Sequence, residues 1–476
     1  MFFNSLHFAV FLPIVFILYW ALSKKDLTYQ SILLLVASYF FYACWDWRFL
    51  FLLLFSTSLD YFTAIKIFDA NTESAKKKWF WLSILVNLGF LGVFKYYDFF
   101  VNSLAEGLTK IGLHANFATL NIILPVGISF YTFHGLSYII DIYKDRITPE
   151  KNFITYSLFV CYFPLLVAGP IERATHLLPQ IKKKRVFDYT KAKDGVYQII
   201  WGLFKKIVIA DSCAQYANEI FNNYHTMNSL SLLLGAFYFS FQIYGDFSGY
   251  SDIALGTSKL FGIDLLRNFN YPYFSRDIAE FWRRWHISLS SWFRDYLYIP
   301  LGGSQRNIGM KIRNTFIIFL VSGFWHGANW TFIFWGGLNA LYFLPLLLTH
   351  KNRNNIEIVA KGKQLPSIKE FGGMLLTFLL TMLAWVFFRA HTIKDAMLYI
   401  KGIFKGDFTI QYFSFERYSP ELLLLVLLFI ITEWFSREYE HPIFGKYQMG
   451  KALLIITGIL VLGSFSNISD FIYFQF

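Results

Sequence analysis

Two histidines stand in apolar surroundings and are the first candidates for chemistry. His326 lies in the run Val321-Ser-Gly-Phe-Trp-His-Gly-Ala-Asn-Trp330, and no other ionisable group occurs from Thr315 to Trp335. An ionisable side chain inside an apolar, membrane-like segment is costly and by default marks a functional site. Such surroundings disfavour the charged form, so the imidazole stays neutral close to neutral pH. A neutral imidazole can take a proton from an attacking hydroxyl, as acyl transfer from a thioester requires.

The plainer alternative for His326 is a hydrogen-bonded structural histidine, or a haem or metal ligand. Gly323 and Gly327 form a GxxxG pair, and Ala328 adds a third small residue. Small residues let helices pack closely, and close packing would bring other groups up to His326. We therefore take His326 as a candidate catalytic residue at a tight helix contact, and we expect no metal site.

The second histidine, His286, lies in the segment Phe281-Trp-Arg-Arg-Trp-His286. The spacing predicts one helix over Asp277–Trp292. Asp277 and Glu280 resemble a capping box, and Glu280 can reach Arg284 four residues further on. An apolar stripe recurs at helical spacing, at Ile278, Trp282, Trp285, Leu289 and Trp292. His286 should share a face with Trp282, on a helix that lies at a membrane interface.

Basic residues gather in the same third of the chain. From Arg267 onward they are Arg276, Arg283, Arg284, Arg294, Arg306, Lys311 and Arg313, with few acids among them. Guanidinium groups pair bidentately with phosphate, so the cluster suits a phosphorylated ligand. The alternative is that these arginines lie at headgroup level on an interfacial helix, and both can hold together. Signatures of other enzyme classes are missing: the chain has no GxSxG, HExxH, Walker A or GxGxxG motif.

The composition places these residues in a membrane protein. The chain of 476 residues is 56% hydrophobic and 21% aromatic, and its mean hydropathy is +0.43. Charged residues make up 16%, against about 25% in soluble globular proteins. The net charge of +12 is better explained by cationic loops that orient helices than by nucleic acid, and no nucleic-acid partner is expected. Cys44, Cys161 and Cys213 are expected to be inert core thiols.

Apolar blocks long enough to cross a bilayer number roughly a dozen, and the chain reads as one membrane domain over residues 1–476. The candidate spans are Leu6–Leu22, Ile32–Cys44, Phe49–Phe68, Trp79–Phe94, Phe153–Ala168, Val196–Ile209, Leu230–Tyr244, Thr315–Trp335, Leu338–Leu348, Phe371–Phe388, Leu422–Trp434 and Leu453–Leu462. Lys24 and Lys25 and the cluster Lys76–Lys78 fall on one side if the spans alternate, which predicts a cytoplasmic side there and an N-terminus outside. The stretch Asn121–Tyr143 is apolar but broken by Pro125, Gly127 and Gly135, and we expect it to line the protein interior.

Several motifs together resemble the membrane-bound O-acyltransferase superfamily, in the bacterial branch typified by the alginate O-acetyltransferase membrane subunit. They cover nearly the whole chain and are Phe3-Asn-Ser5, Leu124-Pro-Val-Gly-Ile-Ser-Phe-Tyr-Thr-Phe133, Ala168-Gly-Pro-Ile171, Gly245-Asp-Phe-Ser-Gly-Tyr-Ser-Asp252, Phe281-Trp-Arg-Arg-Trp-His286, Tyr296-Leu-Tyr-Ile-Pro-Leu-Gly-Gly303, Trp325-His-Gly-Ala328 and Phe471-Ile-Tyr-Phe-Gln-Phe476.

The resemblance implies an all-α, polytopic fold: a ring of tilted transmembrane helices, with re-entrant and interfacial helices around a central tunnel. It implies that His326 and His286 are the catalytic pair. It also implies acetyl-CoA as cytoplasmic donor, an extracytoplasmic polysaccharide as acceptor and a periplasmic or surface partner of acetyltransferase or esterase type. The CoA phosphates would meet the arginine-rich segment at Arg283, Arg284, Arg294 and Trp285. The protein would then reside in a bacterial cytoplasmic (inner) membrane.

Three alternatives stay open at this point. The acceptor can be an exopolysaccharide such as alginate, or peptidoglycan. A more distant branch suggests D-alanyl transfer to teichoic acid. From another class, a transporter or flippase for a lipid-linked sugar would also use broken helices such as Asn121–Tyr143, although no paired, similarly interrupted halves are found.

Overall fold

A computed structural model describes residues 1–113, 117–120, 122–166, 169–305, 307–408, 419–465 and 471–472. Throughout these ranges the regular secondary structure is helical, without a strand, which confirms the all-α prediction. The chain divides into two compact units, one of residues 1–195 with 257–266 and the other of residues 196–256 with 267–476. Ala168, Arg306, Asn121 and the closing residues 473–476 lie outside the described residues. The single domain over residues 1–476 and the ring around a tunnel stay predictions.

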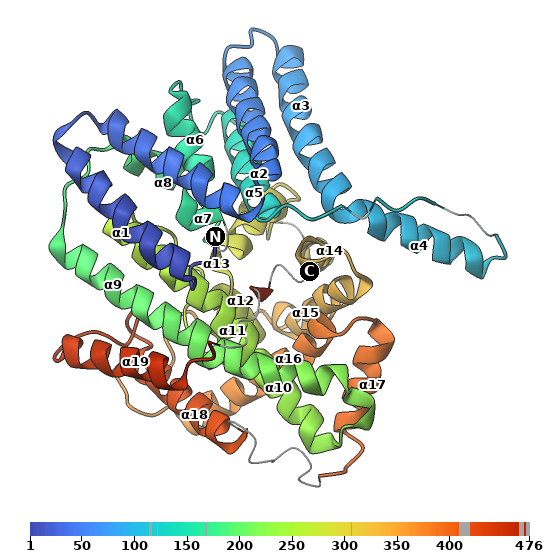
Figure 1. Cartoon of the computed structure of the whole chain (residues 1–476). Coiled ribbons are helices and arrows are strands. Elements are labelled where there is room, and N and C mark those ends of the chain that lie inside the picture. Colours follow the sequence, from blue (N-terminus) through green and yellow to red (C-terminus); the bar gives the residue numbers. More distant parts are fainter. Residues whose placement is uncertain are drawn as a thin grey trace. The chain divides into compact units, whose positions relative to one another are not determined.

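The first unit consists of helices from the N-terminal part of the chain (Figure 1). Its helices are α1 (Leu6–Ala21), α2 (Leu27–Phe68), α3 (Glu73–Leu91), α4 (Tyr97–Lys110), α5 (Ile128–Tyr143), α6 (Phe153–Cys161), α7 (Phe163–Leu166) and α8 (Ala174–Lys182). Helix α2 is kinked at Asp46, whose backbone is extended (φ −155°, ψ 110°). Its two arms therefore correspond to the separate spans expected at Ile32–Cys44 and Phe49–Phe68. The second arm packs beside α3 (Figure 1).

The broken stretch Asn121–Tyr143 lies in the interior of this unit, as expected. Its helical part, α5, begins after Gly127, which adopts a left-handed conformation with φ 72°. A Cβ at that position would clash with the carbonyl oxygen of Leu166, so only glycine fits both the dihedral and the space. Nearly every residue of α5 is buried, including His134 and Asp141. Cys161 is buried too, but Cys44 is exposed, so the expectation of a core thiol is wrong for Cys44.

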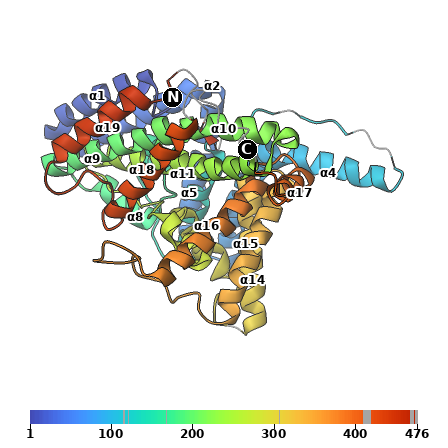
Figure 2. The same ribbon diagram turned by 90° about the horizontal axis from the view of Figure 1, so that it is seen from below.

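The second unit carries both candidate histidines. Its helices are α10 (Asp211–Asn222), α12 (Ile278–Arg284), α13 (Ile287–Phe293), α14 (Ile308–His326), α15 (Trp330–Leu348), α16 (Ile368–Arg389), α17 (Ile393–Ile403), α18 (Ser419–Ser436) and α19 (Gln448–Leu462), and the boundary between the units falls within α9 (Tyr189–Leu203) and α11 (Ser229–Leu260). Helices α14 and α15 form a hairpin, and α16 packs against α15 (Figure 2).

Glycines bring the two arms of the hairpin into close contact. A Cβ on Gly323 of α14 would clash with the carbonyl oxygen of Phe332, and a Cβ on Gly336 of α15 would clash with that of Phe319. Close approach of this kind is what small residues permit between membrane helices. The tight packing expected around His326 is therefore confirmed, with Gly336 as a partner that the GxxxG pattern did not include.

Five helical segments within the described ranges are long and apolar enough to cross a membrane. They are Leu6–Lys24, Leu27–Phe68, Glu73–Lys110, Trp330–Leu348 and Ile368–Arg389. The span expected over Thr315–Trp335 is wrong, because the chain leaves the helix after His326 and starts α15 at Trp330. The expected span Phe153–Ala168 holds only the short helices α6 and α7. The protein is thus a multi-pass membrane protein, and its other described helices lack either the length or the apolar composition of a full span.

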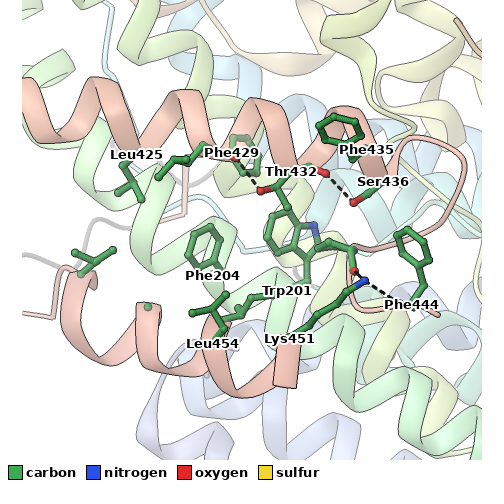
Figure 3. Close-up of a pocket in the computed structure, with 15 residues that line it drawn as sticks. Trp201, Phe204, Leu425, Phe429, Thr432, Phe435, Ser436, Phe444, Lys451 and Leu454 are labelled. Atoms are coloured by element: carbon green, nitrogen blue, oxygen red, sulfur yellow. Dashed lines mark hydrogen bonds between the residues drawn. The ribbon is translucent and has the colours of Figure 1, made fainter. Parts of the chain in front are cut away.

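A large pocket between α18 and α19 lacks the groups that chemistry needs. It encloses about 490 Å³, and its walls are apolar side chains such as Phe204, Phe429 and Leu454 (Figure 3). The hydroxyls of Thr432 and Ser436 donate to helix carbonyls at 2.8 and 2.7 Å. The ammonium of Lys451 donates to the carbonyl oxygens of Phe444 and Pro442 at 2.9 and 3.3 Å.

Candidate active site

His326 is the last residue of α14, and the sequence ends the helix there. Gly327 follows with an extended backbone (φ −160°). Asn329 then caps α15, because its side-chain oxygen accepts the backbone N–H of Thr331 at 3.0 Å. The imidazole is thus held at the turn of the α14–α15 hairpin, and the residue is 4% exposed. The sequence predicted the burial of His326 but not its position at a helix end.

Aromatic rings enclose the imidazole of His326. Its ring centroid lies 5.0 Å from that of Trp325, 5.2 Å from that of Trp335 and 5.5 Å from that of Phe388. These three neighbours are themselves buried, so the histidine faces the protein interior and not lipid. Trp335 also stacks on Trp385, with ring centroids 5.5 Å apart. Rings from α14, α15 and α16 therefore fix the orientation of the site.

His286 lies at a break in the helix that the sequence predicted to be continuous over Asp277–Trp292. Helix α12 ends at Arg284, Trp285 is extended, and His286 adopts a left-handed conformation (φ 45°, ψ 55°) before α13 begins. A left-handed histidine is uncommon, and strained backbone of this kind clusters at functional sites. The stripe residues Trp285, Leu289 and Trp292 are buried, so the apolar stripe faces the protein, and the position at a membrane interface stays a prediction. The N-cap by Asp277 is confirmed.

A neighbouring loop holds this break in place. The carbonyl oxygen of Asn268 accepts the backbone N–H of Ile287 at 2.9 Å. The side-chain oxygen of Asn268 accepts the hydroxyl of Ser288 at 2.6 Å. On the other side of the break, the N–H of Asn270 donates to the carbonyl oxygen of Arg284 at 3.0 Å. These bonds compensate for the ladder bonds lost at the break, and they fix where the His286 ring points.

The two imidazoles lie near each other in the core of the unit. Their ring centroids are 6.3 Å apart, and the centroid of His286 lies 4.7 Å from that of Phe247. Phe247 in turn contacts Phe471 in the C-terminal segment, with centroids 6.1 Å apart. The N–H of Ile472 donates to the carboxylate of Asp246 at 2.6 Å. Phe471, the first residue of the closing motif, therefore lies one ring away from His286.

Three arginines line a pocket at the far end of the α14–α15 hairpin, which we call the arginine pocket. It encloses about 270 Å³ and includes Trp282, Arg283, Arg294 and Arg353, and none of its lining residues is acidic. Arg283 donates to the carbonyl oxygens of Asn352 and Asn355, both at 2.8 Å. Arg294 starts a π-helical turn, Arg294–Tyr298, and pairs with Asp295. The excess of positive charge suits an anionic ligand.

Two other basic residues of the sequence cluster, Arg276 and Arg284, lie outside this pocket. Arg276 and Arg284 both pair with Glu280, at 3.0 and 2.8 Å. Trp285 packs on Trp385, with centroids 5.0 Å apart. Of the four donor-binding candidates, the structure brings Arg283 and Arg294 together and places Arg284 and Trp285 outside the pocket. Arg353 also lines this pocket but lies outside the cluster in sequence, and nothing except its charge marked it as a ligand-binding residue.

A second pocket lies at the turn of the hairpin, and we call it the turn pocket. It encloses about 440 Å³ and is lined by Ala328, Asn329, Thr331, Phe332, Phe388, Arg389, Ala390 and His391. Phe388 lies between this pocket and His326. On the opposite side, Trp282 of the arginine pocket contacts Trp335, with centroids 5.6 Å apart, and Trp335 contacts His326. Phe388 thus separates the imidazole from the turn pocket. Trp335, which packs against Trp282, separates it from the arginine pocket.

This arrangement can serve a transfer between two ligands. His326 lines neither pocket, so a donor from one side and an acceptor from the other would reach this base once Phe388 and Trp335 move aside. Burial lowers the pKa of His286 to about 3, so that ring is neutral near pH 7 and is a weak base. His286 lies outside the helices that could span a membrane. Sequence reasoning missed Asn268, Phe247, Arg389 and Thr331, because their roles depend on contacts between distant segments.

Comparison with known proteins places the chain among acyltransferases. The profile of the membrane-bound O-acyltransferase family, MBOAT, matches residues 144–384. The chain is 37% identical to the peptidoglycan O-acetyltransferase of Helicobacter pylori, over 98% of this chain and 95% of that protein. It is 39% identical to the probable alginate O-acetylase of Pseudomonas aeruginosa, over 92% of this chain and 82% of that protein.

A more distant match is the teichoic acid D-alanyltransferase of Streptococcus thermophilus, with 32% identity over 55% of this chain and 68% of that protein. The matched family segment begins directly after α5, and it includes α14, α15 and both histidines. The identity extends across nearly the whole chain in the O-acetyltransferases, so the resemblance seen in the motifs is confirmed. This multi-pass protein belongs to the membrane-bound O-acyltransferase family.

Proposed function

We propose that this protein transfers an acetyl group from acetyl-CoA at the cytoplasmic side to a hydroxyl of an extracytoplasmic polysaccharide. The observation that carries the proposal is the position of His326 between the arginine pocket and the turn pocket. Two relatives that align over most of the chain are named for O-acetylation of peptidoglycan and of alginate. The aligned relative named for D-alanyl transfer covers about half of it, so acetyl is the acyl group that the comparisons favour.

The charges of the loops support the assignment of sides. The connection between α15 and α16 carries Lys351, Arg353, Lys361 and Lys363 against one acid, Glu357. The turn between α14 and α15, Gly327-Ala-Asn329, carries no charge. Because cytoplasmic loops are rich in Lys and Arg, the arginine pocket would open to the cytoplasm and the turn pocket to the outside. The same rule is the basis for an N-terminus outside, whereas residence in a bacterial cytoplasmic membrane is what the family resemblance implies.

In the proposed reaction His326 is the general base. Its neutral imidazole takes the proton of the acceptor hydroxyl as the oxygen attacks the thioester carbonyl. The carbon–sulfur bond breaks, the thiolate of CoA leaves and takes up a proton, and an acetyl ester remains. His286 positions the donor or assists the proton transfer. Arg283, Arg294 and Arg353 bind the phosphates of CoA. A variant of this scheme has His326 carry the acetyl group before the hydroxyl attacks.

The acceptor chemistry and the partner are further parts of the proposal. A partner protein outside the membrane, of acetyltransferase or esterase type, would assist the transfer of the acetyl group to the polysaccharide. Mass spectrometry of the peptidoglycan and of the secreted glycans from a deletion strain tests this. Loss of acetyl esters from one glycan, restored by the wild-type gene and not by a His326→Ala variant, is the expected result. Unchanged acetylation of every glycan would contradict the proposal.

A further inference from the structure

We propose that the turn pocket binds a carboxylate of the acceptor sugar, with Arg389 and Thr331 as the donors. This inference rests on the proposed function, because it names the chemical class of the acceptor that the pocket takes. Neither residue belongs to the motifs that identify the family, and both line the pocket next to Phe388. The ligand is thus an acidic sugar, a uronate or a sugar that carries a carboxylic acid substituent.

The guanidinium of Arg389 is fixed, and within the described ranges no acidic side chain pairs with it. Arg389 is the last residue of α16. Its Nη2 donates to the side-chain oxygen of Asn218 at 3.0 Å, and its guanidinium carbon lies 5.7 Å from the ring centroid of Phe221. The Nε–H is buried and has no acceptor within the described part of the chain. A guanidinium that is held by a neutral amide and an aromatic ring keeps its full charge for a ligand.

Thr331 offers a second donor in the same pocket. The residue is 1% exposed. Its backbone N–H donates to Asn329, but its hydroxyl is buried without a hydrogen-bond partner among the residues that the structure describes. A buried hydroxyl that makes no hydrogen bond destabilises the fold, and native proteins satisfy nearly all such groups. A ligand that accepts from this hydroxyl would remove that cost.

Charge and size favour a carboxylate over other anions. Among the lining residues, Arg389 carries the one permanent charge, and His391 is the other group that can become cationic. One full charge suits a monoanion better than a phosphate dianion. The nearest acid in sequence, Asp395, accepts from Tyr224 and from Thr392 at 2.9 and 2.8 Å, so its oxygens are directed to those hydroxyls. The volume of about 440 Å³ lies in the range of small-molecule sites.

The pocket is also placed to present a sugar hydroxyl to the catalytic centre. Phe388 lines the pocket, and its ring centroid lies 5.5 Å from that of His326. A sugar that is anchored by its carboxylate at the rim would extend its hydroxyls toward this ring. The carboxylate contact would therefore orient the sugar as well as bind it.

Binding of a trisaccharide of mannuronic acid to the purified full chain in detergent tests the inference, with neutral mannotriose as the matched ligand. Titration calorimetry should show binding of the acidic sugar and at least about tenfold weaker binding of the neutral one. Arg389→Gln should weaken binding of the acidic sugar by about tenfold or more, to the level of mannotriose, and Arg389→Lys by less. Thr331→Val keeps the side-chain volume and should weaken it roughly threefold to tenfold.

Lys394→Gln is the matched control, because Lys394 is an exposed cation close in sequence that does not line the pocket. It should leave binding unchanged. If Arg389→Gln fails to fold, the Thr331→Val variant still decides, since Thr331 takes no part in the bond to Asn218. Equal binding of both sugars, or equal loss in the Lys394 variant, would overturn the inference. Either outcome would leave a carboxylate of a partner protein as the alternative ligand of the turn pocket.

Turnover of acetyl-CoA by the same preparations distinguishes failure of the carboxylate site from failure of the proposed function. Wild-type protein that consumes acetyl-CoA but does not discriminate between the two sugars contradicts the carboxylate site alone. Wild-type protein that binds the acidic sugar but never consumes acetyl-CoA, with or without a partner, contradicts the proposed function and leaves the binding site supported.

Discussion

The imidazole rings of His286 and His326 lie 6.3 Å apart between centroids, with their planes inclined at 46°. They come from different elements, the break between α12 and α13 and the end of α14. This separation exceeds the reach of a direct hydrogen bond between the rings, but it allows both to contact one small group between them. We therefore expect the two histidines to act on the same reaction in different roles.

Replacement of His326 should abolish acyl transfer. His326→Gln retains a polar side chain of similar size but cannot act as a base, so we expect a loss of roughly 10² to 10⁴ in the rate of transfer. The measurement is release of CoA from acetyl-CoA by purified protein, together with the content of acetyl esters in the glycans of cells. His7→Gln, an exposed histidine in α1, is the control and should retain full activity.

Wild-type turnover by His326→Gln at normal expression would contradict the assignment of His326 as the general base. Retained hydrolysis of acetyl-CoA with lost transfer would instead favour a role for His326 toward the acceptor alone.

His286 should make the stability of the protein depend on pH. Burial lowers the pKa of His286 to about 3 in the folded protein, against about 6.5 in the unfolded chain. Below that unfolded value the unfolded state takes up a proton that the folded state cannot bind, so the free energy of unfolding falls as the pH falls. The loss approaches about 1.4 kcal/mol per pH unit, or about 2 kcal/mol at pH 5.

The measurement is the thermal unfolding midpoint at about pH 7 and about pH 5, in wild type and in His286→Asn. Asparagine tolerates the left-handed backbone at this position, so the variant removes the titrating ring with little added strain. The midpoint should drop less in the variant than in wild type on acidification. An equal drop in both proteins would show that other groups cause the pH dependence.

The sequence alone predicted the class of the protein, the helical fold and the two histidines, because composition and local motifs determine them. It did not predict the break at His286, because the bonds that support it come from Asn268 and Asn270, which precede the helix by a loop. A stripe of apolar residues at helical spacing was stronger local evidence for a continuous helix. Long-range hydrogen bonds overrode that propensity.

The donor site was predicted in part for a similar reason. A run of arginines in the sequence shows that positive charge is present but not where each side chain points. Arg276 and Arg284 both pair with Glu280 and are not directed into the pocket. Arg283 and Arg294 meet Arg353, which lies beyond α15 in sequence, only through the fold of the α14–α15 hairpin. Arg389 and Thr331 gave no signal, because a single arginine at a helix end and a threonine after a cap are ordinary in sequence.

The arginine pocket should affect binding of the donor more than the chemical step. Arg283→Gln, Arg294→Gln and Arg353→Gln should each raise the KM for acetyl-CoA by roughly threefold to thirtyfold, with a smaller change in kcat, because each removes a charge-assisted contact to phosphate. Lys351→Gln is the control, an exposed cation close to Arg353 in sequence that does not line the pocket. Increased ionic strength should raise the wild-type KM and have less effect on the variants.

A lower kcat with an unchanged KM in all three arginine variants would move the donor phosphates away from this pocket. Arg284→Gln is informative for the same reason: its guanidinium pairs with the buried Glu280, so loss of the pair should lower the thermal midpoint without a selective rise in KM.

Two adjacent glycines of α15 should respond differently to the same substitution. A Cβ on Gly336 would clash with the carbonyl oxygen of Phe319 in α14, whereas a Cβ on Gly337 would make an ordinary 3.5 Å contact with the side chain of Leu320. Backbone cannot move aside as a flexible side chain can, so Gly336→Ala must push the two arms of the hairpin apart. Overpacking of this kind costs about 1–3 kcal/mol. Gly337→Ala removes a helix-destabilising glycine and should be neutral or slightly stabilising.

The clash also has a functional consequence, because Trp335 precedes Gly336 and contacts His326 at 5.2 Å between ring centroids. Separation of α14 from α15 would move that ring relative to the imidazole, and small displacements at a reacting centre lower the rate steeply. Gly336→Ala should therefore lower kcat in the folded fraction of the protein, and Gly337→Ala should not. Normal kcat in a folded Gly336→Ala protein would mean that the hairpin contact supports the fold and does not position the histidine.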